Sequence, residues 1–241
     1  MTDIATNLNT IDDSLSDIKT SIVNKGGTVS GNITTFATAI DNIPSGGGSS
    51  GKYQLLERVK DDNNVEIGTV SGFFTDANNV EYAVVCLDAQ YRQDEVGNWT
   101  SDNGVVTNLP ADFNLALWST KETATSNTQK ILDWCSANNY TSDACSFCRT
   151  HSFVIDGVTY YGQLPNIVEL VGIFIHREEI NTLNNDPDHW MIPENEGALS
   201  SNQNSADKCW IAGEGGGMMT YNKQTGNYDA LPVLEIPNAT S

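Results

Sequence analysis

The stretch FVIDGVTYYGQLPN, from Phe153 to Asn166, contains the strongest local structure signals in the chain. Two short β-prone runs, 153–155 and 158–160, are separated by Asp156 and Gly157. An Asp-Gly pair suits a two-residue hairpin turn, because both central positions of that turn require a left-handed backbone. The sequence therefore predicts a β-hairpin here.

A helix is predicted to begin directly after this hairpin, at Asn166. The Asn166 side chain can cap the first turn, and Glu169, three residues later, completes a capping box. The apolar residues that follow recur at helical spacing and are expected to form the buried face: Ile167, Leu170, Val171, Phe174 and Ile175. A second helix is predicted over Ser126–Asn139, where apolar residues form a similar stripe.

Strands are predicted on either side of these helices. Before them lie Val65–Phe74 and Val80–Leu87, joined by a turn at 76–79, and then a polar segment, 92–110, that is expected to be a surface loop. After them, the chain is expected to be loop-rich through Gly197 and to end in short strands at Cys209–Ala212, Met218–Tyr221 and Tyr228–Ile236. These elements indicate an α+β domain over residues 52–241.

The first 24 residues have the apolar pattern of a coiled coil. Apolar residues are spaced by 4, 3, 4, 3 and 4 positions, at Ile4, Leu8, Ile11, Leu15, Ile18 and Ile22. The isoleucines then occupy d positions, which favours three or four parallel strands over two. The sequence predicts an oligomerisation stalk over 1–24, with a homotrimer as the main expectation and a tetramer, or one amphipathic helix packed on the domain, as alternatives.

A linker is predicted between the stalk and the domain. Residues 25–51 contain a possible short helix and end in the run SGGGSSG, Ser45–Gly51. Such Gly/Ser runs behave as flexible chains. The predicted organisation is therefore stalk, 1–24; short helix and linker, 25–51; and globular domain, 52–241.

The overall charge excludes some partners. The 241 residues include 31 acidic and 12 basic ones, a net charge of −19. Such a chain is repelled by phosphate backbones and by anionic lipids, so we expect neither nucleic acid binding nor membrane insertion. The beginning of the sequence has no basic and apolar signal pattern, and we expect no secretory signal.

Four stretches resemble the variable proteins of diversity-generating retroelements. They are LLERVKDD (55–62), YAVVCLDA (82–89), the hairpin-and-helix stretch 153–166, and LPVLEIP (231–237). The resemblance covers roughly residues 53–237. It implies a C-type-lectin-like fold of the formylglycine-generating-enzyme-like subgroup. In that family a reverse transcriptase copies a template with errors at adenines, and the copy replaces the 3′ part of the gene. The stalk and linker are similar to the N-terminal parts of phage tail and fibre proteins.

The resemblance also implies where a ligand binds. The diversified positions fall between Leu199 and Asp229, although Leu199 and Cys209 stand where the family pattern expects Trp and Ala. The composition of this segment suits an adaptable binding surface, but an ordinary loop-rich edge has the same composition. The expected ligand-binding residues are Asn202, Asn204, Asp207, Trp210, Glu214, Tyr221, Asn222, Asn227, Tyr228 and Asp229. The strand Val233–Ile236 is expected to support them from the core.

The sequence gives little indication of a metal site or of a catalytic site. Three thiols and one imidazole could hold structural zinc: those of Cys135, Cys145, Cys148 and His151. Only Cys145 and Cys148 form a closely spaced pair, so we mainly expect these cysteines to be buried thiols without a metal. The five cysteines are expected to be reduced. No Gly-x-Ser-x-Gly or His-Glu-x-x-His motif occurs. We expect no catalytic residues and no cofactor.

The main functional hypothesis is a hypervariable receptor-binding protein. It would act in host attachment on a bacteriophage tail fibre, made in the bacterial cytoplasm, with a host cell-surface protein or glycan as its partner. The alternatives are a structural fibre or virion-decorating protein without variable binding, or an enzyme of the formylglycine-generating-enzyme-like fold.

The stalk hypothesis predicts a trimer in solution. Light scattering should give three times the chain mass for the full-length protein, because the apolar seam of residues 1–24 is buried only between copies. A chain that starts at Lys52 should be monomeric. A full-length protein that remains monomeric at micromolar concentration contradicts the hypothesis.

Overall fold

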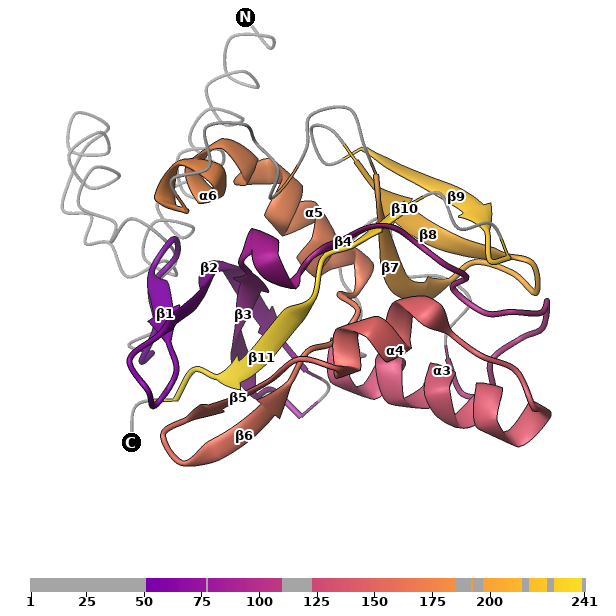
Figure 1. The fold of residues 1–241 in the computed structure, drawn as a ribbon, viewed down its shortest axis with the longest axis horizontal. Helices are drawn as coiled ribbons and strands as arrows, with labels where there is room; N and C mark the ends of the chain where they lie inside the picture. Colours follow the sequence, from indigo (N-terminus) through magenta and orange to yellow (C-terminus); the bar gives the residue numbers. More distant parts are fainter. Residues whose placement is uncertain are drawn as a thin grey trace, which may run out of the picture. The chain divides into compact units, whose positions relative to one another are not determined.

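The computed structural model describes residues 51–76, 78–109, 123–184, 192, 197–213, 217–224 and 228–239. The chain divides into two units at Gly51, and the described residues beyond Gly51 belong to the second, Lys52–Ser241. The predicted stalk, 1–24, and nearly all of the predicted linker lie outside the described residues. Within the described part, the fold is mixed α+β (Figure 1), which confirms the predicted fold class.

One antiparallel sheet joins the beginning of the domain to its end. Its strand order is β1-β2-β3-β11 (Figure 1), with β1 at Arg58–Lys60, β2 at Glu66–Thr75, β3 at Glu81–Leu87 and β11 at Val233–Pro237. The predicted strands Val65–Phe74 and Val80–Leu87 are confirmed to within a residue or two. The turn between them is held by Asp76, whose Oδ1 accepts from the backbone N–H groups of Asn78 and Val80.

A second sheet is built mainly from the C-terminal part of the chain. Its order is β4-β10-β7-β8-β9, with β4 at Gln93–Val96, β7 at Ala198–Gln203, β8 at Lys208–Ala212, β9 at Met218–Asn222 and β10 at Tyr228–Ala230. The last predicted strand, Tyr228–Ile236, is thus two strands, β10 and β11, which belong to different sheets. Strand β7 was not predicted, and all six of its residues are buried.

The predicted hairpin is confirmed as a separate two-stranded sheet. Strand β5 at Ser152–Ile155 pairs with β6 at Val158–Tyr161. Both turn residues have positive φ, 52° at Asp156 and 75° at Gly157, as this turn requires. The carboxylate of Asp62 accepts from the backbone N–H groups of both turn residues, which ties the hairpin to the strand β1 region.

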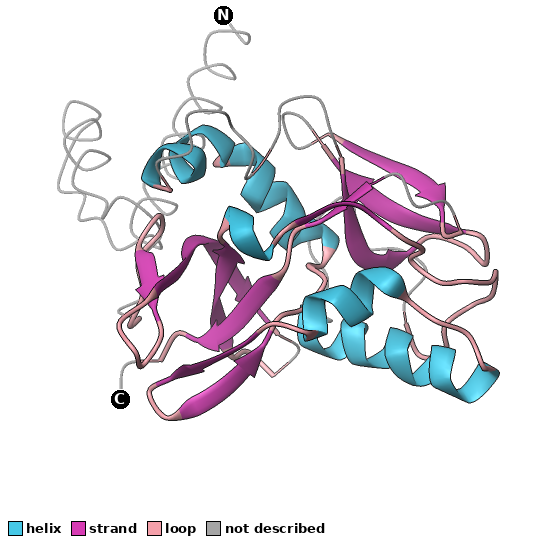
Figure 2. Cartoon of the chain, in the orientation of Figure 1, coloured by secondary structure: helices cyan, strands magenta, loops and turns pink. Residues whose placement is uncertain are grey.

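Four α-helices and a short 3-10 helix, Ala89–Tyr91, are described, and one of the α-helices lies between the two large sheets (Figure 2). That helix is α5, Ile167–Ile175, which contacts β2, β7 and β8. The others are α3 at Ala124–Asn138, α4 at Asp143–Arg149 and α6 at Arg177–Leu183. None of these described helices is long and apolar enough to cross a membrane.

The helix predictions are confirmed in part. Both halves of the Asn166–Glu169 capping box are present, and α3 begins two residues before its predicted start, where Thr123 accepts from Ser126 N–H. The prediction that Ile175 is buried was wrong, because α5 ends at this residue and its side chain is 61% exposed. Helices α4 and α6 were not predicted.

The prediction of a surface loop over residues 92–110 was also wrong. Strand β4 occupies its beginning, and Trp99, Val106 and Leu109 are buried in one cluster with α3, α4 and the second sheet. The Trp99 indole N–H donates to the carbonyl oxygen of Ser200 at 2.7 Å. This segment covers the second sheet, because Val96, Trp99, Val106 and Leu109 are buried, whereas Val105 is 60% exposed.

The starts of α3 and α5 are linked by two buried glutamates. Both oxygens of Glu235, in β11, accept from the first N–H groups of α3, at Ala124 (2.7 Å) and Thr125 (2.9 Å). Burial, and then the neighbouring Glu235 carboxylate, raise the pKa of Glu169 well above its ordinary value. A protonated Glu169 can donate to Glu235, whereas a charged Glu169 would place two carboxylates together in the core.

This pair predicts a pH-dependent contribution to stability. Because the pKa of Glu169 is raised in the folded state, its protonation stabilises the fold, and this contribution is fully present below the ordinary glutamate pKa. It is lost as pH rises through the pKa that Glu169 has in the folded state. Glu169→Gln keeps the shape of the protonated form and cannot ionise. Urea unfolding measures the free energy of unfolding at several pH values. Relative to the wild type, this free energy should increase in the variant as pH rises, by on the order of 1 kcal/mol or more at neutral pH.

The matched control is Glu179→Gln, an exposed glutamate on α6. Its unfolding free energy should follow that of the wild type at every pH. Parallel pH curves for Glu169→Gln and the wild type would show that the buried pair makes no such contribution.

Candidate binding surface

The ten residues predicted to bind a ligand are divided by the structure into four groups. Asp207 and Asn222 are exposed, and Asn202 and Asp229 are buried. The partly buried residues are Asn204, Trp210, Tyr221 and Tyr228. Glu214 and Asn227 lie outside the described residues. Among the eight described residues of the set, those of the first and third groups have side chains that a partner can reach, and Asn202 and Asp229 do not.

Asn202 has a structural role. It is completely buried in β7, and its Oδ1 accepts from the backbone N–H of Ile167 at 2.8 Å. That N–H belongs to the first turn of α5 and has no partner within the helix itself. Asn202 therefore fixes the start of α5 against the second sheet, and its inclusion in the predicted surface is corrected.

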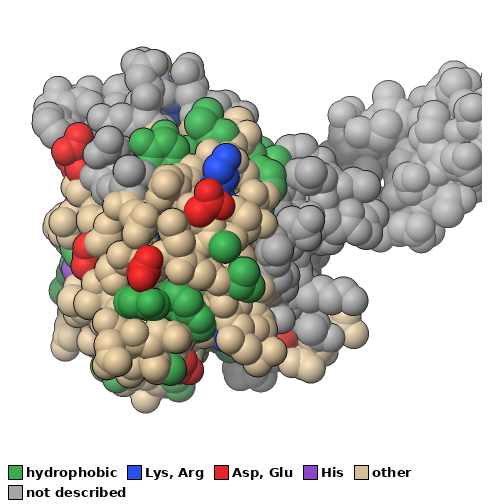
Figure 3. Space-filling view, turned by 90° about the vertical axis from the view of Figure 1, so that its right-hand side faces the viewer, with side chains coloured by type: hydrophobic (Ala, Val, Ile, Leu, Met, Phe, Trp, Pro, Cys, Tyr) green, Lys and Arg blue, Asp and Glu red, His purple; other side chains and the backbone are tan. Residues whose placement is uncertain are grey.

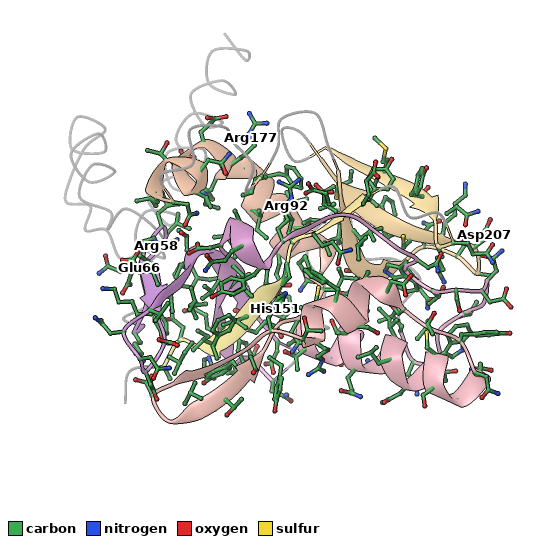
Figure 4. All side chains as sticks on the ribbon, viewed as in Figure 1. Arg58, Glu66, Arg92, His151, Arg177 and Asp207 are labelled. Carbon is green, nitrogen blue, oxygen red and sulfur yellow. The ribbon has the colours of Figure 1, made fainter. Side chains whose placement is uncertain are left out.

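Asp229 is also part of the interior. Its carboxylate is 2.7 Å from the Arg92 guanidinium, and both side chains are 5% exposed. Its second oxygen accepts from the Glu95 backbone N–H at 3.1 Å. Arg92 lies between the two sheets (Figure 4), so this ion pair holds β10 to the β4 strand beside it. Asp229 is likewise removed from the surface set.

The aromatic residues of the set pack with one side against the core. The rings of Tyr221 and Tyr228 meet edge to face, with centroids 4.4 Å apart, beside the cluster under α3 and α4. Trp210 packs against the cluster around α5 on the other face of the sheet. Each ring is held in place by the core on one side and has part of its area accessible to a partner. An aromatic ring held in this way can contribute a large apolar area to a binding contact.

The exposed residues are at the outer end of the second sheet. Asp207 lies in the loop before β8 and points outward (Figure 4), and Asn222 ends the edge strand β9. The Ser205 hydroxyl donates to Asp207 at 2.7 Å, and this bond lowers the pKa of Asp207. Met219, in β9, is 58% exposed and was missed by the sequence analysis, because methionine gives no signal of its own.

Lys223 is a buried residue that was not predicted from the sequence. Its side chain is completely buried, and its Nζ donates to the carbonyl oxygen of Gly104 at 2.8 Å and to Gln203 Oε1 at 3.3 Å. It also lies 4.7 Å from the centre of the Trp99 ring. Burial lowers the pKa of this ammonium group to about 8. Lys223 therefore holds the turn after β9 against the segment 99–104.

The cysteines considered for zinc binding lie in the core. Cys135, Cys145 and Cys148 are buried beside β8, and desolvation raises the pKa of Cys135 to about 11 and of Cys145 to about 12. His151 contacts the rings of Tyr91 and Phe147 edge to face, and burial lowers its pKa. In the part of the chain that the structure describes, no three His, Cys, Asp or Glu residues are grouped to hold a metal ion.

Two aspartate substitutions test whether Asp229 belongs to the interior and Asp207 to the accessible surface. Asp229→Ala should lower the unfolding free energy by roughly 3 kcal/mol, because it removes one carboxylate from a buried ion pair with the Arg92 guanidinium. Asp207→Ala, in the same segment, should cost less than about 0.5 kcal/mol. Chemical unfolding measures both, and equal costs would contradict the assignment.

Comparison of the chain with protein-family models, with curated proteins and with solved structures finds no match.

Proposed function

We propose that this protein is a non-catalytic, hypervariable ligand-binding protein of the kind diversified by retroelements. In this proposal its 52–241 domain is a C-type-lectin-like domain, carried on a trimeric stalk at a phage tail fibre. The observation that carries the proposal is the contrast within the C-terminal segment. Accessible polar, aromatic and methionine side chains on β8, β9 and the loop before β8 lie beside a strand of the same sheet, β7, that is entirely buried.

The buried frame supports the proposal because a variable surface needs a scaffold that does not vary with it. Strand β7 is hydrogen-bonded on both sides, to β10 and β8, and β11 is buried over residues 233–236. The outer strand β9 contacts the frame through β8 alone in the described sheet order. Changes at the exposed β9 residues Met219 and Asn222 therefore disturb few contacts of the core.

The chemistry of the surface also supports a binding role. The segment 197–229 has three acidic and two basic residues in a protein with a net charge of −19. Of these five, Asp229 and Lys223 are buried. Figure 3, which views the molecule from the right-hand side of Figure 1, shows mainly neutral side chains with small hydrophobic groups and few charges. Such a surface suits a protein or glycan receptor.

The protonation state of the buried cysteine thiols supports a non-catalytic role. The thiols of Cys86, Cys145 and Cys209 are buried, and their raised pKa values keep them protonated near neutral pH. A thiol in that state is a poor nucleophile and a poor metal ligand. The proposal accordingly includes no cofactor, and a host cell-surface molecule is the partner.

The neighbouring DNA tests the diversification. We expect a reverse-transcriptase gene and a near-copy of the 3′ end of this gene, differing from it only at adenines. The differing codons should fall at accessible positions such as Asp207, Trp210, Met219 and Asn222. They should spare Ser200 and Ser201, since those side chains are completely buried. Differences spread evenly over buried and accessible codons would contradict the proposal.

A matched pair of double variants tests the same surface on the protein. Asp207→Ala with Met219→Ala should abolish attachment of the labelled full-length protein to its host cells. The control, Glu179→Ala with Leu183→Ala, removes one exposed charge and one exposed apolar side chain from α6 and should leave attachment intact. Attachment that survives the first pair and fails with the second would place the contact surface elsewhere.

A further inference from the structure

The turn between β5 and β6 (Figure 1) contains the one Asp-Gly pair of the sequence, Asp156–Gly157, and both residues are exposed. In such a pair the backbone nitrogen of the glycine can attack the side-chain carboxyl carbon of the aspartate. Glycine favours this attack because it has no side chain to hinder it. Apart from its chain neighbours, no described atom lies within 4 Å of the place that a Cβ atom on Gly157 would occupy. The outer side of the turn therefore has room for the reaction.

The reaction is a dehydration followed by a hydrolysis. The Gly157 nitrogen forms a bond to Asp156 Cγ and gives up its proton, while the bond from Cγ to one carboxyl oxygen breaks and that oxygen leaves as water. The product is a five-membered succinimide ring. One water molecule then opens the ring at either of its carbonyl carbons. This gives aspartate again, or isoaspartate, in which the main chain runs through Cβ and Cγ.

Two contacts in the folded protein oppose the first step. The Asp62 carboxylate accepts from the Gly157 N–H at 2.8 Å and from the Asp156 N–H at 2.7 Å. A nitrogen whose N–H is bound to a carboxylate keeps its proton until that bond breaks. In addition, Lys52 Nζ forms an ion pair with the Asp156 carboxylate. The Asp156 side chain must leave this partner before its carboxyl carbon can meet the Gly157 nitrogen.

Asp62 is brought to the hairpin by the turn between β1 and β2. Asp61 Oδ1 accepts from the Val65 N–H at 2.9 Å, which shapes that turn. The Asp62 backbone N–H donates to the Val154 carbonyl oxygen of β5 at 2.8 Å. Asp62 and Asp156 are 94 residues apart in the sequence, so their contact depends on the tertiary fold. The unfolded chain has the reactive pair without this contact.

We propose that Asp156 is a site of spontaneous isoaspartate formation and that Asp62 controls its rate. The hydrogen bonds from the hairpin turn to Asp62 are exposed to water, and exposed bonds open more readily than buried ones. Isoaspartate adds one carbon atom to the main chain, so the two-residue turn loses its geometry and its bonds to Asp62. Modification therefore uncouples the hairpin from the β1 region. The proposal does not rest on the receptor-binding proposal.

Peptide mass spectrometry of aged full-length protein tests the site. The protein is kept in warm neutral buffer, and electron-transfer fragmentation distinguishes isoaspartate from aspartate at position 156. In the folded wild type, isoaspartate should form about tenfold more slowly than in the same protein unfolded in guanidinium chloride, because only the fold supplies the charged hydrogen bond at Gly157. Equal rates, or no isoaspartate at position 156 in either state, overturn the proposal.

Three variants test the role of Asp62. Asp62→Ala removes both acceptor oxygens and should raise the rate in the folded protein about tenfold. Asp62→Asn keeps one acceptor oxygen and should give an intermediate rate. The control is Asp133→Asn, which removes an exposed carboxylate from α3 and should leave the rate unchanged. An Asp62→Ala rate equal to that of the wild type overturns the proposal.

The pair Asn103–Gly104 reports general unfolding in the same samples. It reacts by the same attack, with loss of ammonia instead of water, and its Gly104 N–H donates to the Ala206 carbonyl oxygen at 2.7 Å. Its rate should be the same in the Asp62 variants as in the wild type, because it belongs to the segment that covers the second sheet. If both sites react faster in Asp62→Ala, that variant is unfolded and Asp62→Asn replaces it. A parallel rise at both sites in both variants overturns the proposal.

Discussion

The described domain depends on the hydrogen bonds that join the buried polar strand β7 to the elements around it. Four of its six residues, Ser200–Gln203, are polar and completely buried. Their partners come from every neighbouring part: Trp99 and Val106 in the covering segment, Asn127 in α3, and Ile167 at the start of α5. An unsatisfied polar group in this position costs about 1–3 kcal/mol, so these bonds select one arrangement of the elements.

This arrangement separates a buried frame from the accessible side chains of the C-terminal segment. The strand β7, the Arg92–Asp229 ion pair and the buried Lys223 fix the inner part of the C-terminal segment. The loop before β8 and the edge strand β9 lie outside that frame. A cleft between the hairpin and the first sheet is lined in part by β3 and β11, which pair with each other.

The elements that could be predicted from sequence are those with a local cause. The Asp156-Gly157 turn, the Asn166–Glu169 capping box and the two strands joined by the turn at Asp76 each need only neighbouring residues, and all were confirmed. Strand β7 was missed because Ser-Ser-Asn-Gln has the composition of a loop, and only its distant partners make it a buried strand. The segment 92–110 was misjudged for the same reason, since its four buried apolar residues, Val96, Trp99, Val106 and Leu109, are widely spaced.

For the candidate surface, sequence alone determined the segment, its polar and aromatic composition and its low charge. It could not separate Asn222 from Asn202, or Asp207 from Asp229, because residue type does not specify exposure. Tertiary structure decided this through contacts over long sequence distances: Asp229 meets Arg92 137 residues away, and Asn202 meets the start of α5 35 residues away. The cleft likewise exists only where β3, β6, β11 and two helix ends converge, and no local pattern encodes that convergence.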